Sequence, residues 1–429
     1  MALLSLILLP FIAIEGRHPG VAAFVVCIAT LVVIIDGRLS NSNSVAIRVL
    51  GFAGDRSYSL YLVHWPIFAF MGNAWVGATP GELPLWTSLS AVLTALILAE
   101  LLYRYVEDPI RRMNVGYSLE RFGILVGVSG GLVLISATFL PFFGSSVNAT
   151  DVRRVNFGLD RSCDTGSDAF SETEKCKVGD DPQILLWGDS YAMHLVPGIV
   201  ASGDEKLGLV QATRTACGPL LGLAPVESQY RMGHNEHWAE SCIAFNDSVL
   251  SYLRGNPEIR TVVLSSPFRA YVERGSYRVR VRSGGSYSTV EPVRDVALAG
   301  LSRTVDEIRA MGRAVVIVAP PPSSDFNIGA CLQRRAETKL VLGADDDCQV
   351  EEVEFRRLRS EVIQLLNEIE ATKGVSVVRF DQFLCNGVRC ETSWKGIPLY
   401  RDSGHFSYDG SRVIGAEMDL HRMITERAM

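Results

Sequence analysis

The sequence predicts a helical membrane segment followed by an α/β domain with a parallel sheet. Residues 1–144 contain eight arginines, eight acidic residues and no lysine, and they are rich in long apolar stretches. From residue 183 onward, short apolar runs alternate with amphipathic segments, which is typical of parallel strands covered by helices on both faces. The net charge of −6 lies entirely after residue 144. These patterns exclude a purely soluble enzyme, a disordered chain and a basic nucleic-acid-binding protein.

The first third of the chain predicts about five membrane helices. A helix needs about 20 residues to cross a bilayer. The last three of five apolar stretches have this length, the second is marginal, and the first reaches only about two-thirds of the way. We therefore interpret the first stretch as the remainder of a longer helix. The five stretches are residues 2–14, 20–36, 58–76, 84–106 and 121–143.

The distribution of arginine predicts the orientation of these helices. Arginines lie between the second and third stretches and between the fourth and fifth, whereas the loop 77–83 has no basic residue. Because basic loops stay in the cytoplasm, the fifth helix is expected to lead outward. The sequence therefore predicts a multi-pass membrane protein, with residues from about 145 onward outside the cytoplasmic membrane.

The cysteines provide an independent indication of export. One of nine, Cys27, lies in an apolar stretch, and the other eight all lie downstream. An even number in an exported domain predicts disulfides, although free buried thiols are the alternative. Neither a CxxC motif nor a cysteine–histidine spacing supports a metal site. Spacing favours neighbours among the 105 possible connectivities, namely Cys163–Cys176, Cys217–Cys242, Cys331–Cys348 and Cys385–Cys390.

Residues 145–182 are polar and irregular, and we expect a linker with a loop that leads into the domain at 183–429. Sites in parallel α/β sheets lie at the carboxyl ends of the strands, so the residues after each strand are of most interest. The expected strands are 183–187, 207–213, 260–266, 313–320 and 375–380. The expected helices lie near 191–203, 238–255, 293–311, 351–373 and 409–426.

A candidate nucleophile follows the first strand. Gly188 and Asp189 precede Ser190, which is expected at a strand-to-helix turn where helix amides face the site. A serine hydroxyl becomes a nucleophile only beside a base. Gly-Asp-Ser is also ordinary turn and helix-capping chemistry, so this motif alone is weak.

A candidate base precedes the last helix. Asp402 stands three residues before His405, and a loop carboxylate at this spacing can turn back to accept the imidazole Nδ1–H. Alone, this spacing also fits a surface loop or a helix cap. Three rival bases are interpreted as structural or solvent-facing histidines, namely His194, His234 and His237.

Together, the two motifs resemble the SGNH (GDSL-like) hydrolase superfamily, and residues 385–410 resemble the end of SGNH domains fused to membrane acyltransferases. The resemblance implies a flavodoxin-like three-layer fold with Ser190 as nucleophile, His405 as base and Asp402 as its orienting group. It also implies oxyanion donors. No asparagine follows the third strand, so these donors are expected from Ser190, Gly218 and Ser266, with Arg269 as a further possibility.

The membrane third contains Ser-Tyr-Ser-Leu-Tyr-Leu-Val-His-Trp-Pro at 57–66, which closely resembles a late helix of acyltransferase family 3, of the OafA type. Within it, His64 has either a structural interhelix hydrogen bond or a direct role. Glu107 and Arg111, in a second matching motif, are expected to stabilise the cytoplasmic end of a helix. The family's early helices have no counterpart in this sequence, so the chain resembles the C-terminal part of such a fusion.

The resemblance implies a membrane-anchored O-acyltransferase, a multi-pass protein of the bacterial inner membrane whose C-terminal domain lies in the periplasm or another extracytoplasmic space. It would transfer an acyl group, expected to be acetyl, through an acyl-serine to a hydroxyl of a cell-envelope polysaccharide or lipopolysaccharide. An extracytoplasmic SGNH carbohydrate esterase and a non-catalytic, membrane-anchored glycan-binding module are the alternatives. No metal or bound cofactor is implied, and acetyl-CoA or another acyl donor is expected. The expected partners are the glycan, the bilayer and a separate polypeptide that supplies further membrane helices.

Overall fold

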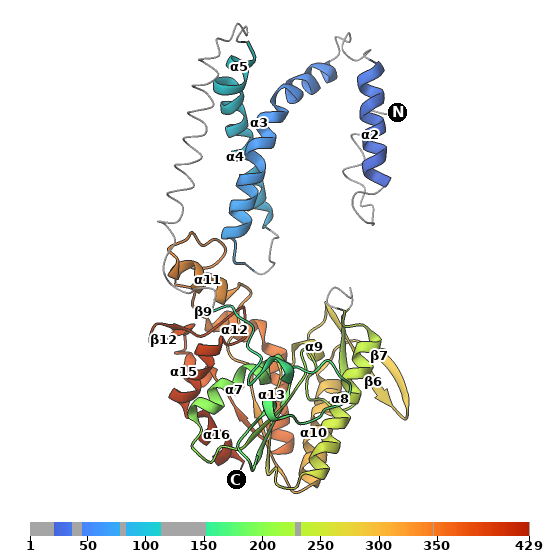
Figure 1. The fold of residues 1–429 in the computed structure, drawn as a ribbon, viewed down its shortest axis with the longest axis vertical. Helices are drawn as coiled ribbons and strands as arrows, with labels where there is room; N and C mark the ends of the chain where they lie inside the picture. Colours follow the sequence, from blue (N-terminus) through green and yellow to red (C-terminus); the bar gives the residue numbers. More distant parts are fainter. Residues whose placement is uncertain are drawn as a thin grey trace. The chain divides into compact units, whose positions relative to one another are not determined.

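The computed structural model describes residues 21–36, 45–77, 83–112, 152–227, 233–345 and 347–428. The described residues separate into two compact units (Figure 1). The first unit comprises residues up to 72 together with those from 83 to 112, and the second comprises residues 73–77 and everything from 152 onward.

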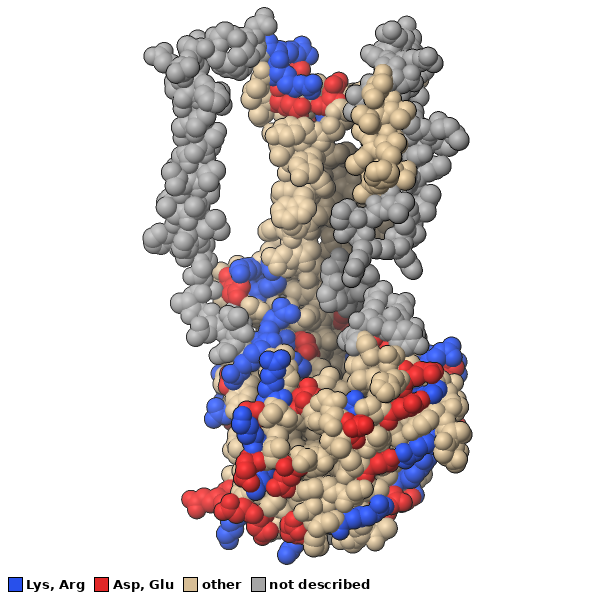
Figure 2. All heavy atoms as spheres, turned by 45° about the vertical axis from the view of Figure 1, so that its right-hand side comes forward, with Lys and Arg blue, Asp and Glu red and all other residues tan. Residues whose placement is uncertain are grey.

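The first unit is helical. Among the described residues, Leu85–Arg112 is the helix that is long and apolar enough to cross a membrane, and Ala23–Val33 is a shorter apolar helix. Figure 2 shows its charged side chains gathered at one end, around α5. The predicted stretches 2–14 and 121–143 lie outside the described residues. The helices are α2 (Val21–Asp36), α3 (Val45–Ala74), α4 (Leu85–Leu102), the π-helical turn η3 (Tyr103–Glu107) and α5 (Asp108–Arg112).

The second unit is built on a six-stranded sheet with strand order β1-β3-β2-β5-β8-β10. Five strands are parallel and are the five that the sequence predicted, whereas β1 is an antiparallel edge strand. Their carboxyl ends align, with Gly188 opposite both Thr213 and Ser265. The strands are β1 (Lys177–Val178), β2 (Ile184–Gly188), β3 (Leu209–Thr213), β5 (Thr261–Ser265), β8 (Ala314–Val318) and β10 (Ser376–Val378).

Helices cover both faces of this sheet, giving three layers (Figure 1). One face packs against α8 (Glu236–Gly255), α10 (Arg294–Ala310) and α13 (Ser360–Lys373). The other packs against α7 (Ser190–Ser202), α15 (Tyr408–Met418) and α16 (Leu420–Arg427). The strands are buried along their length because they have a core on each side, which explains their uninterrupted apolar sequences.

Two predicted helices are each divided in the structure. The segment 351–373 is interrupted at Arg359, which separates α12 (Glu352–Leu358) from α13. The segment 409–426 is interrupted at Asp419, whose φ of 52° is left-handed and ends α15. Both interruptions are single residues, so the apolar periodicity continues across them.

Several elements were not predicted. The largest is an antiparallel sheet of β4 (Leu223–Glu227), β6 (Tyr277–Ser283) and β7 (Ser286–Val290). A second is α11 (Ile328–Ala336). The remaining short elements are η5 (Arg161–Cys163), η6 (Glu174–Cys176), α9 (Arg269–Val272), β9 (Val350–Glu351), α14 (Asp381–Leu384), β11 (Arg389–Cys390), β12 (Ser393–Trp394) and β13 (Ile397–Pro398).

The described part of the expected linker, residues 152–182, lies against the sheet. Buried Gln211 donates to the Phe157 carbonyl (2.8 Å) and accepts the Leu159 N–H (3.0 Å). Thr213 donates to the Cys163 carbonyl (2.8 Å). These buried polar groups need partners, and the segment supplies them. It is therefore a structural part of the domain, which its polar composition did not indicate.

Four disulfides join the neighbouring cysteines that the spacing favoured: Cys163–Cys176, Cys217–Cys242, Cys331–Cys348 and Cys385–Cys390. Cys27 is a free, exposed cysteine of α2. Each disulfide closes a short loop, which reduces the conformational freedom of the unfolded chain.

Helices α7 and α15 approach closely because glycines face each other at their contact. A Cβ at Gly415 would lie 2.4 Å from the Gly198 Cα, and one at Gly198 would lie 2.6 Å from the Ser411 carbonyl. The Ser411 side chain is held in this contact, because its Oγ accepts the Gly198 N–H (3.0 Å). The contact matters for function because α7 begins at Ser190 and α15 follows His405.

Gly415→Ala is expected to lower the free energy of unfolding of the α/β domain by about 1–3 kcal/mol. Alanine alone would favour a helix by about 1 kcal/mol, but its methyl group collides with backbone that cannot turn away. Denaturant titration of the full chain measures the change. Gly255→Ala at the end of α8 is the matched control, because nothing lies within 4 Å of its Cβ position. Equal stability of the two variants would contradict the packing argument.

Candidate active site

Ser190 occupies the sharp turn between β2 and α7. The strand ends at Gly188, where any Cβ would lie 1.9 Å from the Ser265 carbonyl oxygen, so the close strand contact requires glycine. Asp189 caps the helix by accepting the Tyr191 N–H on Oδ1 (2.9 Å). Ser190 is thereby held in the first helical turn, where backbone N–H groups have no partner within the helix.

The structure brings Ser190, His405 and Asp402 into one hydrogen-bonded chain. Ser190 Oγ lies 2.8 Å from His405 Nε2, although the two residues are 215 positions apart. His405 Nδ1 lies 2.9 Å from Asp402 Oδ2. With the proton on Nδ1, the ring donates to Asp402 and accepts the serine proton on Nε2, which is the arrangement of a nucleophile, a base and an orienting carboxylate.

The Asp402 carboxylate is firmly held. Besides the imidazole, Oδ1 accepts the backbone N–H groups of Gly404 (3.0 Å) and His405 (2.8 Å). Burial acts to raise the pKa of Asp402, but the hydrogen bond and the electrostatic attraction of the His405 ring, together with these amides, hold that pKa well below its usual range. The group is therefore a carboxylate at any physiological pH.

Backbone pairing shapes the loop that presents His405. The Arg401 N–H donates to the His405 carbonyl (3.0 Å), and Tyr400 pairs with Phe406. A Cβ at Gly404 would lie 2.4 Å from the Tyr191 Oη, so glycine lets the loop approach α7. The loop is thus fixed both by its own closure and by contact with the serine-bearing helix.

The rival histidines are not bonded to the serine in the described structure. His194 is 1% exposed, and its Nδ1 accepts the Phe406 N–H (3.3 Å). It therefore stabilises the loop that carries His405. Burial holds the pKa of His194 well below its usual value, which keeps it neutral. His234 packs on the ring of Trp238, and His237 is exposed at the start of α8. The structural interpretation of these residues is consistent with these contacts.

The geometry differs from the oxyanion arrangement that we expected. The Gly218 N–H donates to the Tyr271 Oη (3.0 Å), and the Ser266 hydroxyl donates to Asp189 Oδ2 (2.6 Å). Both donors are therefore already used, and the Ser190 N–H is the member of the expected set that the helix leaves unpaired. The sequence could not reveal this because Tyr271 lies 53 residues from Gly218.

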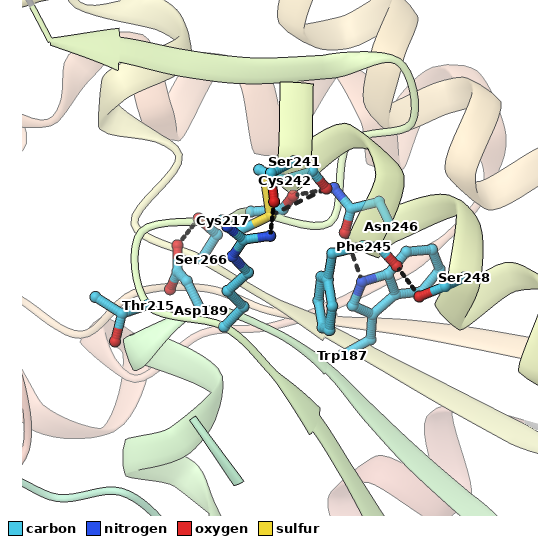
Figure 3. Close-up of a disulfide and its surroundings, with 12 residues drawn as sticks. Trp187, Asp189, Thr215, Cys217, Ser241, Cys242, Phe245, Asn246, Ser248 and Ser266 are labelled. Carbon is cyan, nitrogen blue, oxygen red and sulfur yellow. Dashed lines mark hydrogen bonds between the residues drawn. A yellow bond between two sulfur atoms is a disulfide. The ribbon is translucent and has the colours of Figure 1, made fainter. Parts of the chain in front are cut away.

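The Gly218 loop is fixed by a buried network. Asn246 of α8 donates to the Gly218 carbonyl (2.9 Å) and accepts the Trp187 indole N–H (2.9 Å). The adjacent Cys217–Cys242 disulfide ties the loop to the same helix (Figure 3). Sequence analysis missed Asn246, whose polar side chain at an apolar position of a predicted helix was the available signal.

Arg269, the further oxyanion candidate, is exposed and pairs with Glu273 (2.5 Å). Among the described residues, the cluster with metal-like spacing is Glu352, Cys385 and Cys390. Its two cysteines form a disulfide, so they offer no thiolate to a metal.

The residues of the membrane motif form local contacts within the first unit. Ser59 donates to Glu107 Oε2 (2.5 Å), and Arg111 Nη1 lies 3.5 Å from Glu107 Oε1. His64 Nδ1 lies 3.0 Å from the Leu60 carbonyl of its own helix. His64 also lines an apolar groove of about 440 Å³ together with Tyr61. Glu107 thus joins two helices, while His64 bonds within its own.

Buried Asp189 makes stability depend on pH. It is 2% exposed, and burial raises its pKa to about 7 despite hydrogen bonds from Ser266 and Tyr191. A carboxyl group whose pKa is raised by folding stabilises the folded state. This stabilisation is fully present below the unfolded pKa of 3.8 and is lost as pH rises through about 7.

The free energy of unfolding of the wild type should therefore fall by up to ~3 kcal/mol between pH 5 and pH 8 because of Asp189, and Asp189→Asn is expected to abolish this decrease. Asparagine keeps an acceptor for the Tyr191 N–H and places an amide beside Ser266, but it does not titrate. Denaturant titrations of both proteins at the two pH values measure the difference, in which other titrating groups cancel. Parallel pH dependence of the two proteins would contradict a buried, titrating Asp189.

The second unit is thus an α/β domain that carries a hydrogen-bonded chain of serine, histidine and aspartate at the carboxyl ends of its parallel strands. The chain belongs to the family described as the SGNH domain (fused to AT3 domains), whose model matches residues 162–419.

The curated relatives are similar over short segments. The O-acetyltransferase OatA of Staphylococcus aureus (strain NCTC 8325 / PS 47) is 33% identical over 92 residues, covering 21% of this chain and 15% of that protein. A putative O-acetyltransferase of strain COL is 37% identical over 67 residues, covering 16% and 11%. The matches thus span less than a sixth of these relatives' length. Among solved structures, the periplasmic domain of a lipopolysaccharide acetyltransferase of Salmonella ser. Paratyphi A covers 66% of this chain and 99% of its own, with 15% identity and a TM-score of 0.43.

Proposed function

We propose that this protein is a membrane-anchored O-acyltransferase that works through an acyl-serine at Ser190. The observation that carries the proposal is the chain of hydrogen bonds from Ser190 through His405 to Asp402. Membership in the SGNH family and the relatives named O-acetyltransferases support acyl chemistry. The expected acyl group is acetyl, supplied by acetyl-CoA or another donor.

In the first half-reaction, the Ser190 Oγ attacks the acyl carbonyl while His405 Nε2 takes the hydroxyl proton. The Asp402 carboxylate stabilises the imidazolium that forms. In this mechanism the Ser190 N–H donates to the oxyanion. The tetrahedral intermediate then expels the donor's leaving group, which receives the proton from His405, and leaves an ester on Ser190.

The second half-reaction reverses these steps with a new nucleophile. A hydroxyl of the acceptor gives its proton to His405 Nε2 and attacks the serine ester. Collapse of the intermediate returns the proton to Ser190 Oγ and releases the acylated acceptor. Attack by water in place of the acceptor would release free acid, so the same site can serve an esterase.

We propose a cell-envelope polysaccharide or lipopolysaccharide as the acceptor and an extracytoplasmic location for the domain. Four disulfides support an oxidising compartment. The loop after α3, predicted to lie outside, begins with residues that belong to the same compact unit as the α/β domain. The membrane motif around His64 supports anchoring, with Leu85–Arg112 as a span.

Product partition tests this function against its alternatives. The full chain is incubated with p-nitrophenyl acetate and increasing concentrations of an envelope oligosaccharide. We expect acetylated sugar to rise, and free acetate per turnover to fall, as the acceptor increases. Free acetate alone at every acceptor concentration would establish an esterase. Equal release of p-nitrophenol by the wild type and Ser190→Ala would instead favour the non-catalytic glycan-binding module.

A further inference from the structure

Residues 73–77 form an integral part of the α/β unit. Trp75 pairs in parallel with Leu342, whose N–H donates to the Ala74 carbonyl (2.9 Å). The Val76 N–H donates to the Leu342 carbonyl (2.9 Å), and the Val76 carbonyl accepts the Asn327 N–H (2.6 Å). We call residues 73–77 the strap, because these three backbone bonds attach it to the domain at two separate places.

Side chains reinforce this attachment. Val76 is 3% exposed and packs against the buried Cys331–Cys348 disulfide. Arg334 Nη1 donates to the Asn73 carbonyl (2.8 Å). A Cβ at Gly343 would lie 2.8 Å from the Trp75 ring, and its φ of 84° also favours glycine. The strap is thus held by the apolar contact of Val76, by the hydrogen bond from Arg334 and by the close packing of Trp75 on Gly343.

The same helix start that receives the strap also contacts the catalytic loop. Asn327 caps α11 by accepting the Ala330 N–H (2.9 Å). Two residues along the backbone, the Gly329 N–H donates to the Asp402 carbonyl (3.3 Å). A Cβ at Gly329 would lie 2.2 Å from the carbonyl carbon of Arg401, so no side chain separates the two backbones.

Just before α11, the Ser324 N–H donates to the Ser403 carbonyl (3.2 Å). The catalytic loop therefore accepts two backbone hydrogen bonds from the segment 324–329. A third backbone donor of this segment, the Asn327 N–H, bonds to the strap. The start of α11, which the Cys331–Cys348 disulfide links to the loop that follows, is therefore bonded both to the strap, at Asn327, and to the Asp402 loop, at Gly329.

We propose that the strap is a positioning element for Asp402. It fixes the start of α11, and α11 fixes the backbone that aims the Asp402 carboxylate at His405 Nδ1. The strap begins with the last two residues of α3, so the catalytic geometry depends on a segment that starts at the end of this helix. This inference rests on the proposed function, because it requires Asp402 to orient His405.

The expected effect lies in the rate and not in substrate binding. A misplacement of about 1 Å in a catalytic group can cost about 10²-fold. Val76→Asp places an unpaired charge against the disulfide and should release the strap. We expect kcat for p-nitrophenyl acetate to fall by about 10- to 100-fold in the full chain, with KM changed by less than about threefold. Val76→Ile, which keeps an apolar side chain against the disulfide, should retain the wild-type kcat.

Val353→Asp is the matched control, because this valine is 73% exposed in the first turn of α12, where an acidic residue is tolerated. Wild-type activity is expected for it. Arg334→Gln removes only the hydrogen bond from Arg334 to the strap and should lower kcat by about threefold. This variant keeps the proposal testable if Val76→Asp does not fold. Val76→Asp and Arg334→Gln both matching Val353→Asp would overturn the proposal.

A double-mutant cycle separates positioning from general destabilisation. If the strap acts through Asp402, Val76→Asp should cost less than about twofold in an Asp402→Asn background, because the orienting interaction is already lost. A full 10- to 100-fold cost in both backgrounds would show a role independent of Asp402 and would refute the inference. Failure of the proposed function itself has a different signature, in which Ser190→Ala keeps wild-type activity.

Discussion

Ser190→Ala is expected to lower kcat for acyl transfer by about 10⁴-fold or more, with the domain still folded. The reason is that Ser190 Oγ is the atom held 2.8 Å from His405 Nε2 and at the start of α7. Alanine leaves the oxyanion donor and the base in place but removes the atom that accepts the acyl group. Steady-state kinetics of the full chain with p-nitrophenyl acetate measure the loss.

Ser403→Ala is the matched control for this substitution. Ser403 is exposed in the same catalytic loop, and its contact with Ser324 is made by its backbone carbonyl, which alanine retains. Its kcat should stay within about twofold of the wild type. A rate for Ser190→Ala that matches this control would eliminate the acyl-serine mechanism.

Asp402→Asn is expected to lower kcat by about 10⁴-fold. Asp402 Oδ1 accepts two backbone N–H groups, from Gly404 and His405, and an asparagine carbonyl would keep that position. The amide NH₂ must then occupy the position of Oδ2 and face His405 Nδ1. An amide donor at the Oδ2 position favours the tautomer with the ring proton on Nε2 over a bond from Nδ1–H to the carbonyl, which lies 3.0 Å from the same nitrogen. In that tautomer the imidazole can no longer accept the serine proton.

The control is Asp409→Asn in the first turn of α15, which changes the same functional group near the same loop. It should cost about 0.3–1 kcal/mol of stability, through the helix dipole, and leave kcat unchanged. A decrease of less than about tenfold for Asp402→Asn would show that His405 is oriented by other groups, and the assigned role of Asp402 would be wrong.

The sequence predicted the main sheet because its five parallel strands are buried on both faces and read as uninterrupted apolar runs. The antiparallel sheet was missed although β6 alternates Val279 and Val281 with arginines and is followed by Gly284-Gly285, a pattern typical of a hairpin. Both strands of this hairpin are partly exposed, so neither has the continuous apolar run that identified the main-sheet strands. The divided helices were also missed, since single-residue breaks leave the periodicity intact.

The triad could be predicted because its members stand in fixed relation to secondary structure: a serine after the first strand and a histidine before the last helix. The oxyanion donors could not, since the direction of the Gly218 N–H depends on Tyr271 and the Ser266 hydroxyl depends on Asp189. The contact of the strap with α11 was equally inaccessible, because it joins segments about 250 residues apart through backbone groups that leave no trace in residue type.

The central claim is that an acyl group resides covalently on Ser190 during turnover. Mass spectrometry of the full chain, quenched during turnover of p-nitrophenyl acetate and digested, tests it most directly. We predict a single acetyl increment on the peptide that contains Ser190, absent from Ser190→Ala and diminished when an acceptor oligosaccharide is added. Turnover with that peptide unmodified at every quench time, or with the acetyl group on another residue that responds to acceptor, would contradict the mechanism.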